Sequence, residues 1–331
     1  MKARHNAPLK SLNRPTAAFD RILTNITRET VAYLYDCPYL IADHLVAMEK
    51  ISNFFGHIES WERTMMLIAG ILFFWLIESF IPLFRFSYNK YRHAGLNIFF
   101  TLTTVVINFI FAYLIVKASD YTWTHKLGVL NIVKMPMWLY ILLALMILDF
   151  ISSWLIHWIQ HKVKWMWKFH LIHHSDTFVD TTTANRHHPV ESIFRAVFTL
   201  LAVLVAGSPI WVLFLYQFLS VLFAQFNHAN FSFPKWLDNA MSWVIVSPDM
   251  HKVHHHYEQP LTDTNYGNIF SCWDRLFGTY VHISDVKALK YGIDTYPEET
   301  ENNSLGKLLK IPFEEYRPPA GAKFSNPNPK A

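Results

Sequence analysis

Residues 157–174 read HWIQHKVKWMWKFHLIHH, and they connect one long apolar run to a later pair of apolar runs. The stretch contains an H-x-x-x-H pair, His157 and His161, followed by an H-x-x-H-H group, His170, His173 and His174. Residues three or four positions apart share one face of a helix. If these segments are helical, each group therefore places its imidazoles on one helix face near a membrane-length segment.

The same histidine spacing returns further along the chain. Residues 251–256 read HKVHHH and repeat the H-x-x-H-H group, while His187-His188-Pro189 and His228 lie in between. Imidazoles packed together repel one another when protonated and need hydrogen-bond partners when neutral and buried. Neutral imidazole is a good ligand for iron, zinc and copper. About nine or ten such ligands exceed what one ion needs, so the pattern predicts two metal ions.

Five apolar runs surround these histidine segments. Each has about the 20 residues that are needed to cross a bilayer. The last two are separated only by Gly207-Ser208-Pro209 and predict a helical hairpin, which would return both histidine segments to one membrane side. The runs are Met65 to Phe84, Leu96 to Val116, Pro136 to Ile156, Val190 to Ala206 and Ile210 to Phe226. We expect an all-α, polytopic membrane bundle of about four or five membrane helices with a cytosolic, histidine-rich di-metal cap.

Composition agrees with a membrane protein. Of 331 residues, 52% are hydrophobic and only 16% are charged, whereas soluble domains have about 25% charged residues. The formal net charge of +4 is too small to favour nucleic acid as a partner. The two cysteines, Cys37 and Cys272, exclude a disulfide scaffold or an iron–sulfur cluster on this chain alone, and no G-x-G motif indicates a dinucleotide fold.

The chain is expected to have three parts: an amphipathic and polar N-terminal region (1–62), a membrane-embedded catalytic domain (63–290) and a partly disordered C-terminal tail (291–331). Basic residues in the loop 85–93 and in 157–189 favour the cytoplasmic side for the histidine cluster. The N-terminus is basic as well, which leaves its own side open. A bacterial inner membrane or the endoplasmic reticulum is the expected location.

Two longer patterns resemble a known family. The first contains Trp167-Lys-Phe-His170 and Arg186-x-His188-Pro189-x-Glu191, within residues 149–191. The second contains Asn227-His228-Ala-Asn230, then Ser247-Pro248-x-x-His251-x-x-His254-His255, and then Asn265 to Thr279. Together they resemble the fatty acid hydroxylase superfamily, also called the sterol desaturase family, over roughly residues 65–285. Trp158 departs from the family's pattern, which usually has Arg after the first histidine.

The resemblance implies a membrane di-iron oxygenase that holds two iron ions, with zinc able to replace iron in a purified form. It implies no catalytic residues beyond the metal ligands. His187 and His256 are weaker candidates, because the pattern needs one histidine at each of those places. The implied ligands are His157, His161, His170, His173, His174, His188, His228, His251, His254 and His255.

The expected reaction is O2-dependent hydroxylation, or desaturation, of a membrane lipid such as a sterol or fatty acyl chain. The chain carries no flavin, haem or iron–sulfur motif, so an external electron donor is expected: a cytochrome b5-like protein, a ferredoxin or a reductase. Lys162, Lys164, Lys168 and Lys252 are placed to bind an acidic donor or, equally, lipid headgroups. The alternative is a membrane metal-binding protein without oxygenase activity, such as a zinc-dependent hydrolase or a metal carrier.

Nearby carboxylates suggest support for the ligands. Metal-binding histidines usually donate their second ring N–H to a carboxylate or carbonyl oxygen. Several of the acidic residues next to the histidines are therefore expected to accept such hydrogen bonds, while others cap helices or face solvent. The candidates are Asp149, Asp176, Asp180, Glu191, Asp249 and Asp274.

Overall fold

The computed structural model describes residues 38–320, with side chains from residue 46 onward apart from that of residue 299. The chain divides into two units, Met1–Phe54 and Phe55–Ala331. The N-terminal region expected over 1–62 lies largely outside the described residues. The first described helix, α2, covers Pro38–His57. The remaining helices are α3 Ser60–Phe80, α4 Lys90–Thr124, α5 Met137–Asp149, α6 Ile156–Lys162, α7 Lys164–His174, α8 Pro189–Ala206, α9 Ile210–His228, α10 Lys235–Met241, α11 Pro248–His254, α12 Cys272–Leu276, α13 Glu299–Asn302 and α14 Leu305–Lys310.

The predicted all-α membrane architecture is confirmed. Within the part of the chain that the structure describes, five helical segments are long and apolar enough to cross a bilayer, and each contains one of the expected apolar runs almost completely. Two are longer than the runs, because α4 extends at both ends and α5 continues through α6. Between residues 38 and 320 the backbone forms isolated bridges but no named strand.

The hairpin between α8 and α9 is tight for a steric reason. Gly207 ends α8 with a φ of 70°, in the left-handed region that suits glycine. A Cβ at this position would collide with the Leu127 carbonyl oxygen. Ser119 of α4 donates a hydrogen bond to the Ser208 carbonyl at 2.8 Å. These contacts hold α4, α8 and α9 together at what we call the hairpin end of the bundle.

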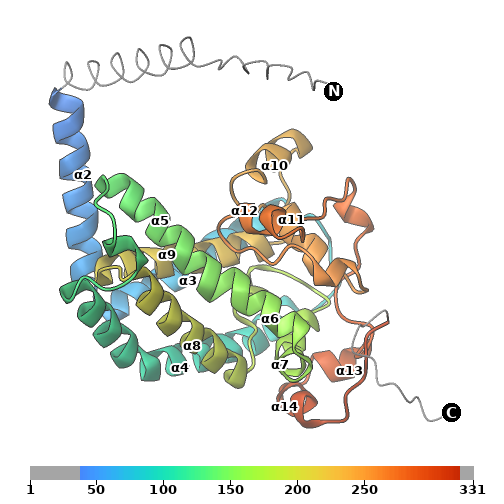
Figure 1. The fold of residues 1–331 in the computed structure, drawn as a ribbon. Coiled ribbons are helices and arrows are strands. Elements are labelled where there is room, and N and C mark those ends of the chain that lie inside the picture. The colour runs from blue at the N-terminus through green and yellow to red at the C-terminus, as the bar shows by residue number, and fades with distance from the viewer. Residues whose placement is uncertain (1–37, 321–331) are drawn as a thin grey trace, which may run out of the picture. The chain divides into compact units, whose positions relative to one another are not determined.

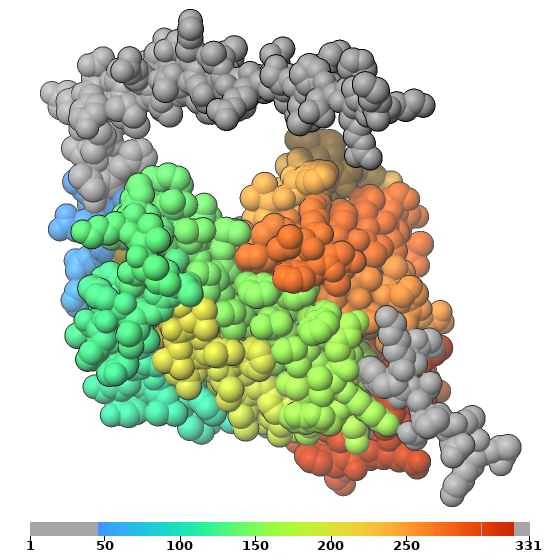
Figure 2. Space-filling model, in the orientation of Figure 1, coloured from blue at the N-terminus to red at the C-terminus, as the bar shows by residue number. Residues whose placement is uncertain are grey.

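The opposite end, which we call the cap end, receives the histidine segments. The Glu78 carboxylate near the C-terminus of α3 accepts hydrogen bonds from the backbone N–H groups of Thr181 and Asn230, at 3.1 and 3.0 Å. Segments that follow α9 gather beside α6 and α7 (Figures 1 and 2). Within the C-terminal tail expected over 291–331, α13 and α14 are helical, and Leu308 and Ile311 are buried against Trp167 of α7.

The third apolar segment is not a regular α-helix throughout. Phe150–Leu155 forms a π-helical turn, η2, between α5 and α6. Ser152 and Ser153 in this turn lie 2.9 Å from the Tyr216 hydroxyl of α9. Such turns carry an additional residue in the helix and are frequent at functional sites. Here the turn comes immediately before the first histidine pair.

Candidate metal centre

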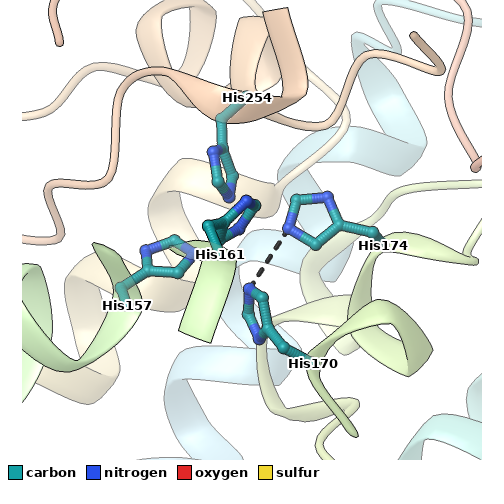
Figure 3. A group of neighbouring side chains, drawn as sticks. All are labelled: His157, His161, His170, His174 and His254. Carbon is teal, nitrogen blue, oxygen red and sulfur yellow. Dashed lines mark hydrogen bonds between the residues drawn. The ribbon is translucent and has the colours of Figure 1, made fainter. Parts of the chain in front are cut away.

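The histidines of four helices meet in two clusters at the cap end. Each residue offers one possible ligand atom, and within a cluster these atoms all lie within 4.8 Å of one another. Cluster A is His157, His161, His170, His174 and His254, and cluster B is His173, His228, His251 and His255. All nine are buried. Figure 3 shows the five rings of cluster A turned toward one central point, although they come from three helices.

The H-x-x-H-H spacing divides each helix between the two clusters. On α7, His170 and His174 join cluster A, whereas His173 joins cluster B. The segment at α11 does the reverse, since His251 and His255 join cluster B and His254 joins cluster A. The i, i+4 pair thus serves one cluster and the i+3 residue serves the other. The repeated motif is therefore what brings two possible metal sites side by side.

The ring nitrogens of cluster B are arranged for an ion rather than for hydrogen bonding. The His228 Nδ1 atom donates to the Ala224 carbonyl at 2.7 Å, which leaves Nε2 with one lone pair when the ring is neutral. Three other Nε2 atoms lie 3.0–3.1 Å from it, those of His173, His251 and His255. One lone pair cannot serve three donors, whereas a cation between the four rings can accept all four lone pairs.

The ring nitrogens of cluster A are also arranged to bind an ion. His157 and His254 donate through Nδ1 to the carbonyls of Tyr266 and Thr264, at 2.9 and 2.7 Å. Their Nε2 atoms, and that of His161, are buried without a hydrogen-bond partner among the described residues. The Nε2 atoms of His170 and His174 are 3.2 Å apart. Two ligands bound about 2.1 Å from an ion at right angles lie about 3.0 Å apart, so both clusters fit metal coordination.

Burial keeps these histidines neutral, which metal binding requires. For His170, His173 and His174, removal from water lowers the pKa below its usual range, and neighbouring histidines add to the effect for the last two. The pKa values of His251, His254 and His255 are lowered for the same first reason. A neutral imidazole exposes the lone pair that a metal ion binds.

Nine of the ten histidines expected as ligands lie in the two clusters, and His188 lies in neither. Its Nδ1 atom accepts the Val190 N–H at 3.2 Å, so this ring caps α8. Its neighbour His187 instead lies against the site: the ring is 4.8 Å from that of His173, and Nδ1 is 3.0 Å from a Glu191 oxygen. The i, i+4 spacing of His187 and Glu191 is a sequence feature that indicates this arrangement, but it was not used in the prediction.

The expected carboxylate support is present at one of the six candidates. Glu191 accepts a hydrogen bond from His170 Nδ1 at 2.8 Å. Asp263, which was not among the candidates, lies 3.6 Å from His161 Nδ1. The other support comes from backbone carbonyls, which sequence reasoning had no means to assign. For His173, His174, His251 and His255, the described residues supply no partner to Nδ1.

The remaining candidate carboxylates hold the surrounding segments in place. Asp274 accepts hydrogen bonds from the N–H groups of Tyr266 and Gly267, both at 2.8 Å, and so orients the carbonyl that His157 uses. Asp176 accepts from His93 and from Thr183 in a buried polar network. Neither carboxylate contacts a ring of cluster A or cluster B.

A cavity of about 490 Å³ reaches the clusters from within the bundle. At the cap end its wall includes His157 of cluster A and His173, His228 and His251 of cluster B. Ser152 and Ser153 of the π-helical turn also line it. Most of its surface is apolar and is supplied by α3, α4, α8 and α9. A ligand inside the bundle can therefore approach both possible metal sites.

Comparison with known proteins gives relatives that are named as monooxygenases or hydroxylases. Alkylglycerol monooxygenase of Xenopus tropicalis is 28% identical over 160 residues, covering 46% of this chain and 32% of that protein. Ornithine lipid hydroxylase OlsE of Rhizobium tropici is 24% identical over 145 residues, covering 44% and 43%. Methylsterol monooxygenase 2-2 of Arabidopsis thaliana is 28% identical over 177 residues, covering 52% and 65%.

The matched part of the chain is the part that carries the site. This chain spans less than half of the length of the first two relatives, and no solved structure matches it. Residues 141–279 match the model of the fatty acid hydroxylase family. That range includes every histidine of clusters A and B. The part of the chain that carries both clusters is therefore similar to the fatty acid hydroxylase family.

Proposed function

We propose that this protein is a membrane di-iron oxygenase that hydroxylates, or desaturates, a lipid chain. The observation that carries the proposal is the pair of buried all-histidine clusters at the end of an apolar cavity. The names of the relatives, two monooxygenases and a lipid hydroxylase, support the same reaction class. A lipid that enters from the bilayer would present its chain to the clusters without leaving apolar surroundings.

The proposed ligands are the nine histidines of clusters A and B, with His187 in place of His188 as the tenth. Bound iron would supply the O2 chemistry, in which one oxygen atom enters a C–H bond and the other leaves as water, using two electrons and two protons from outside the chain. In this reaction the protein itself would hold the histidine rings in place, exclude water and position the lipid. Glu191 and the Tyr266 and Thr264 carbonyls fix the orientation of three rings.

We further propose that a separate protein supplies the electrons, and that the clusters face the cytoplasm. Lys164 and Lys168 lie on α7, the helix that carries three of the cluster histidines. Lys162 lies at the end of α6, where it pairs with Asp263. Positive charge beside the site suits an acidic electron carrier and also the cytoplasmic membrane surface. Lys252 has no part in this surface, because it is buried and donates to the Phe231 carbonyl.

The alternative is a zinc-dependent hydrolase or a metal carrier. Hydrolytic zinc sites hold about three protein ligands and keep a position for water, whereas cluster A has five histidines and cluster B four. A carrier would place ligands along the membrane spans, but the clusters are confined to the cap end. These features favour redox chemistry at two neighbouring ions over either alternative.

The decisive experiment combines metal analysis with turnover. Protein purified from membranes should contain two iron ions per chain and should consume O2 with a lipid extract and a chemical or protein reductant. His228→Ala should remove one ion and abolish turnover. The matched control is His282→Ala, at an exposed histidine outside both clusters, and it should change neither. Tightly bound zinc with no O2 uptake would overturn the assignment.

A further inference from the structure

The cavity that ends at the clusters extends to the other end of the bundle. Its hairpin-end wall includes Ser60 and Arg63 of α3 and Phe214 of α9. From Phe214 to the cluster residue His228, α9 rises about 21 Å at ~1.5 Å per residue. The wall formed by α4, from Thr104 to Val116, gives about 18 Å by the same measure. The cavity is thus a channel that crosses most of the ~30 Å hydrocarbon core.

A cationic side chain stands at the far end of this channel. The Arg63 guanidinium carbon lies 4.3 Å from the centroid of the Phe214 ring, and Nη2 donates to Ser60 Oγ at 2.9 Å. Both contacts turn the group toward the channel, whereas its neighbour Trp61 is 65% exposed. Among the described side chains Arg63 forms no ion pair with a carboxylate, although Glu59, four residues earlier, interacts with it electrostatically. By contrast, Arg195 at the cap end is neutralised by Glu191 at 3.1 Å.

The channel also has a side opening that a lipid can use. Thr64 of α3 and Val105 and Phe109 of α4 line the cavity and are exposed on the outer surface of the bundle. In the membrane this surface faces lipid chains. A single chain can therefore enter sideways between α3 and α4, without passing through water.

We propose that the channel binds a single-chain lipid with an oxyanion head, a carboxylate or a phosphate, held by Arg63, and that its chain runs back to the histidine clusters. The head would lie near the membrane surface opposite the metal centre. A fixed guanidinium binds an oxyanion through charge-assisted hydrogen bonds. A cationic side chain this close to the hydrocarbon core is costly, and a bound oxyanion would offset that cost.

The geometry sets which carbon meets the metal centre. With C–C bonds of about 1.5 Å and angles near 111°, each methylene advances a chain by about 1.25 Å. A path of about 20 Å then holds about 16 methylenes. Resting on the proposed oxygenase function, oxidation should fall about 15–17 carbons from the head. Because the head is anchored, this count should stay constant when the chain is lengthened.

Binding can be tested without turnover. Purified protein in nanodiscs would be titrated with stearate, with 18-carbon lysophosphatidate and with the uncharged octadecanol, and read by native mass spectrometry. Arg63→Gln should weaken binding of at least one anion about tenfold or more and leave octadecanol unchanged. Lys117→Gln is the matched control, since Lys117 is an exposed cation near the hairpin end of α4, outside the channel; it should have no effect.

The comparison of stearate with lysophosphatidate tells which oxyanion Arg63 prefers. Three results would each overturn the proposal. The wild type could bind octadecanol as tightly as both anions, it could bind a sterol more tightly than any chain, or the Arg63→Gln variant could bind both anions normally. Ala112→Trp, which fills the middle of the channel wall, should exclude all three chains while both clusters keep their metal. Ala112→Leu is the milder second variant and should shorten the longest chain accepted.

Analysis of the oxidised lipid products can distinguish failure of this inference from failure of the proposed function. Chains of 16 to 20 carbons would be incubated with protein, reductant and O2, and the oxidised carbon located by mass spectrometry. A position counted from the head supports the anchored geometry, and a position counted from the methyl end overturns it. If no chain is oxidised but the Arg63-dependent binding remains, the oxygenase function fails while the lipid site stands.

Discussion

Two adjacent histidines, His187 and His188, have different surroundings although the sequence treats them as near equivalents. His187 contacts Glu191 and stacks on His173, whereas His188 accepts a backbone N–H at the start of α8. His187→Ala should therefore lower iron content or turnover strongly. His188→Ala should remove a helix cap, worth about 1 kcal/mol, together with ring contacts to Phe169 and Phe313, and should keep both ions. Metal analysis of the two variants side by side checks this, and loss of iron in His188→Ala alone would reverse the assignment.

Glu191 is the carboxylate that accepts a hydrogen bond from the cluster A ring of His170. It is fully buried, and its Oε1 atom is close to His170, His187 and Arg195. Glu191→Gln keeps the shape but replaces a charged acceptor with a weaker neutral one. We expect a loss in iron affinity of about 10–100-fold, as for other outer partners of metal ligands. Competition with an iron chelator measures it, and Glu315→Gln on the exposed C-terminal segment serves as the control.

At the scale of elements, the loop 265–271 is tied to α12 by one carboxylate. Besides the two backbone groups already described, Asp274 accepts from Trp154 Nε1 at 3.0 Å and from Thr279 Oγ1 at 2.7 Å. Asp274→Ala leaves several buried donors unpaired, at a cost of about 1–3 kcal/mol each. Because the Tyr266 carbonyl then loses its position, cluster A should release its ion before cluster B.

The measurement for Asp274→Ala is iron content together with thermal melting in detergent. Asp120→Ala, at an exposed residue of α4, should match the wild type in both. Simultaneous loss of both ions at an unchanged melting temperature would contradict the element-level account, because it would mean that the loop does not support one cluster selectively.

At the scale of the whole molecule, acid should destabilise the fold. Burial lowers the pKa values of His173, His174, His251 and His255 in the folded protein, whereas unfolded histidines titrate near 6.5. Below about pH 6.5 the unfolded chain binds more protons than the folded chain, so stability falls as the pH falls. Melting of metal-free protein between pH 7.5 and 5 checks this, and a melting temperature that stays constant or rises toward pH 5 would contradict it.

The apolar runs were enough to predict the membrane bundle, and the histidine spacing indicated eight of the nine clustered residues, all except His228. Both are local patterns: a run of about 20 apolar residues has few alternatives to a membrane helix, and i, i+3 and i+4 positions share a helix face whatever surrounds them. The π-helical turn at 150–155 could not be predicted, because it depends on contacts of Ser152 and Ser153 with α9.

By itself, the sequence determined the class of fold and the repeated histidine groups that could hold metal ions, since both follow from periodicity and residue type along the chain. Tertiary structure alone decided how the histidines divide into two clusters, which of His187 and His188 meets the site, and that Arg63 stands at the far end of the same channel. These depend on how separate helices pack against one another. The residues involved lie tens to more than a hundred positions apart, and no local pattern records their distance.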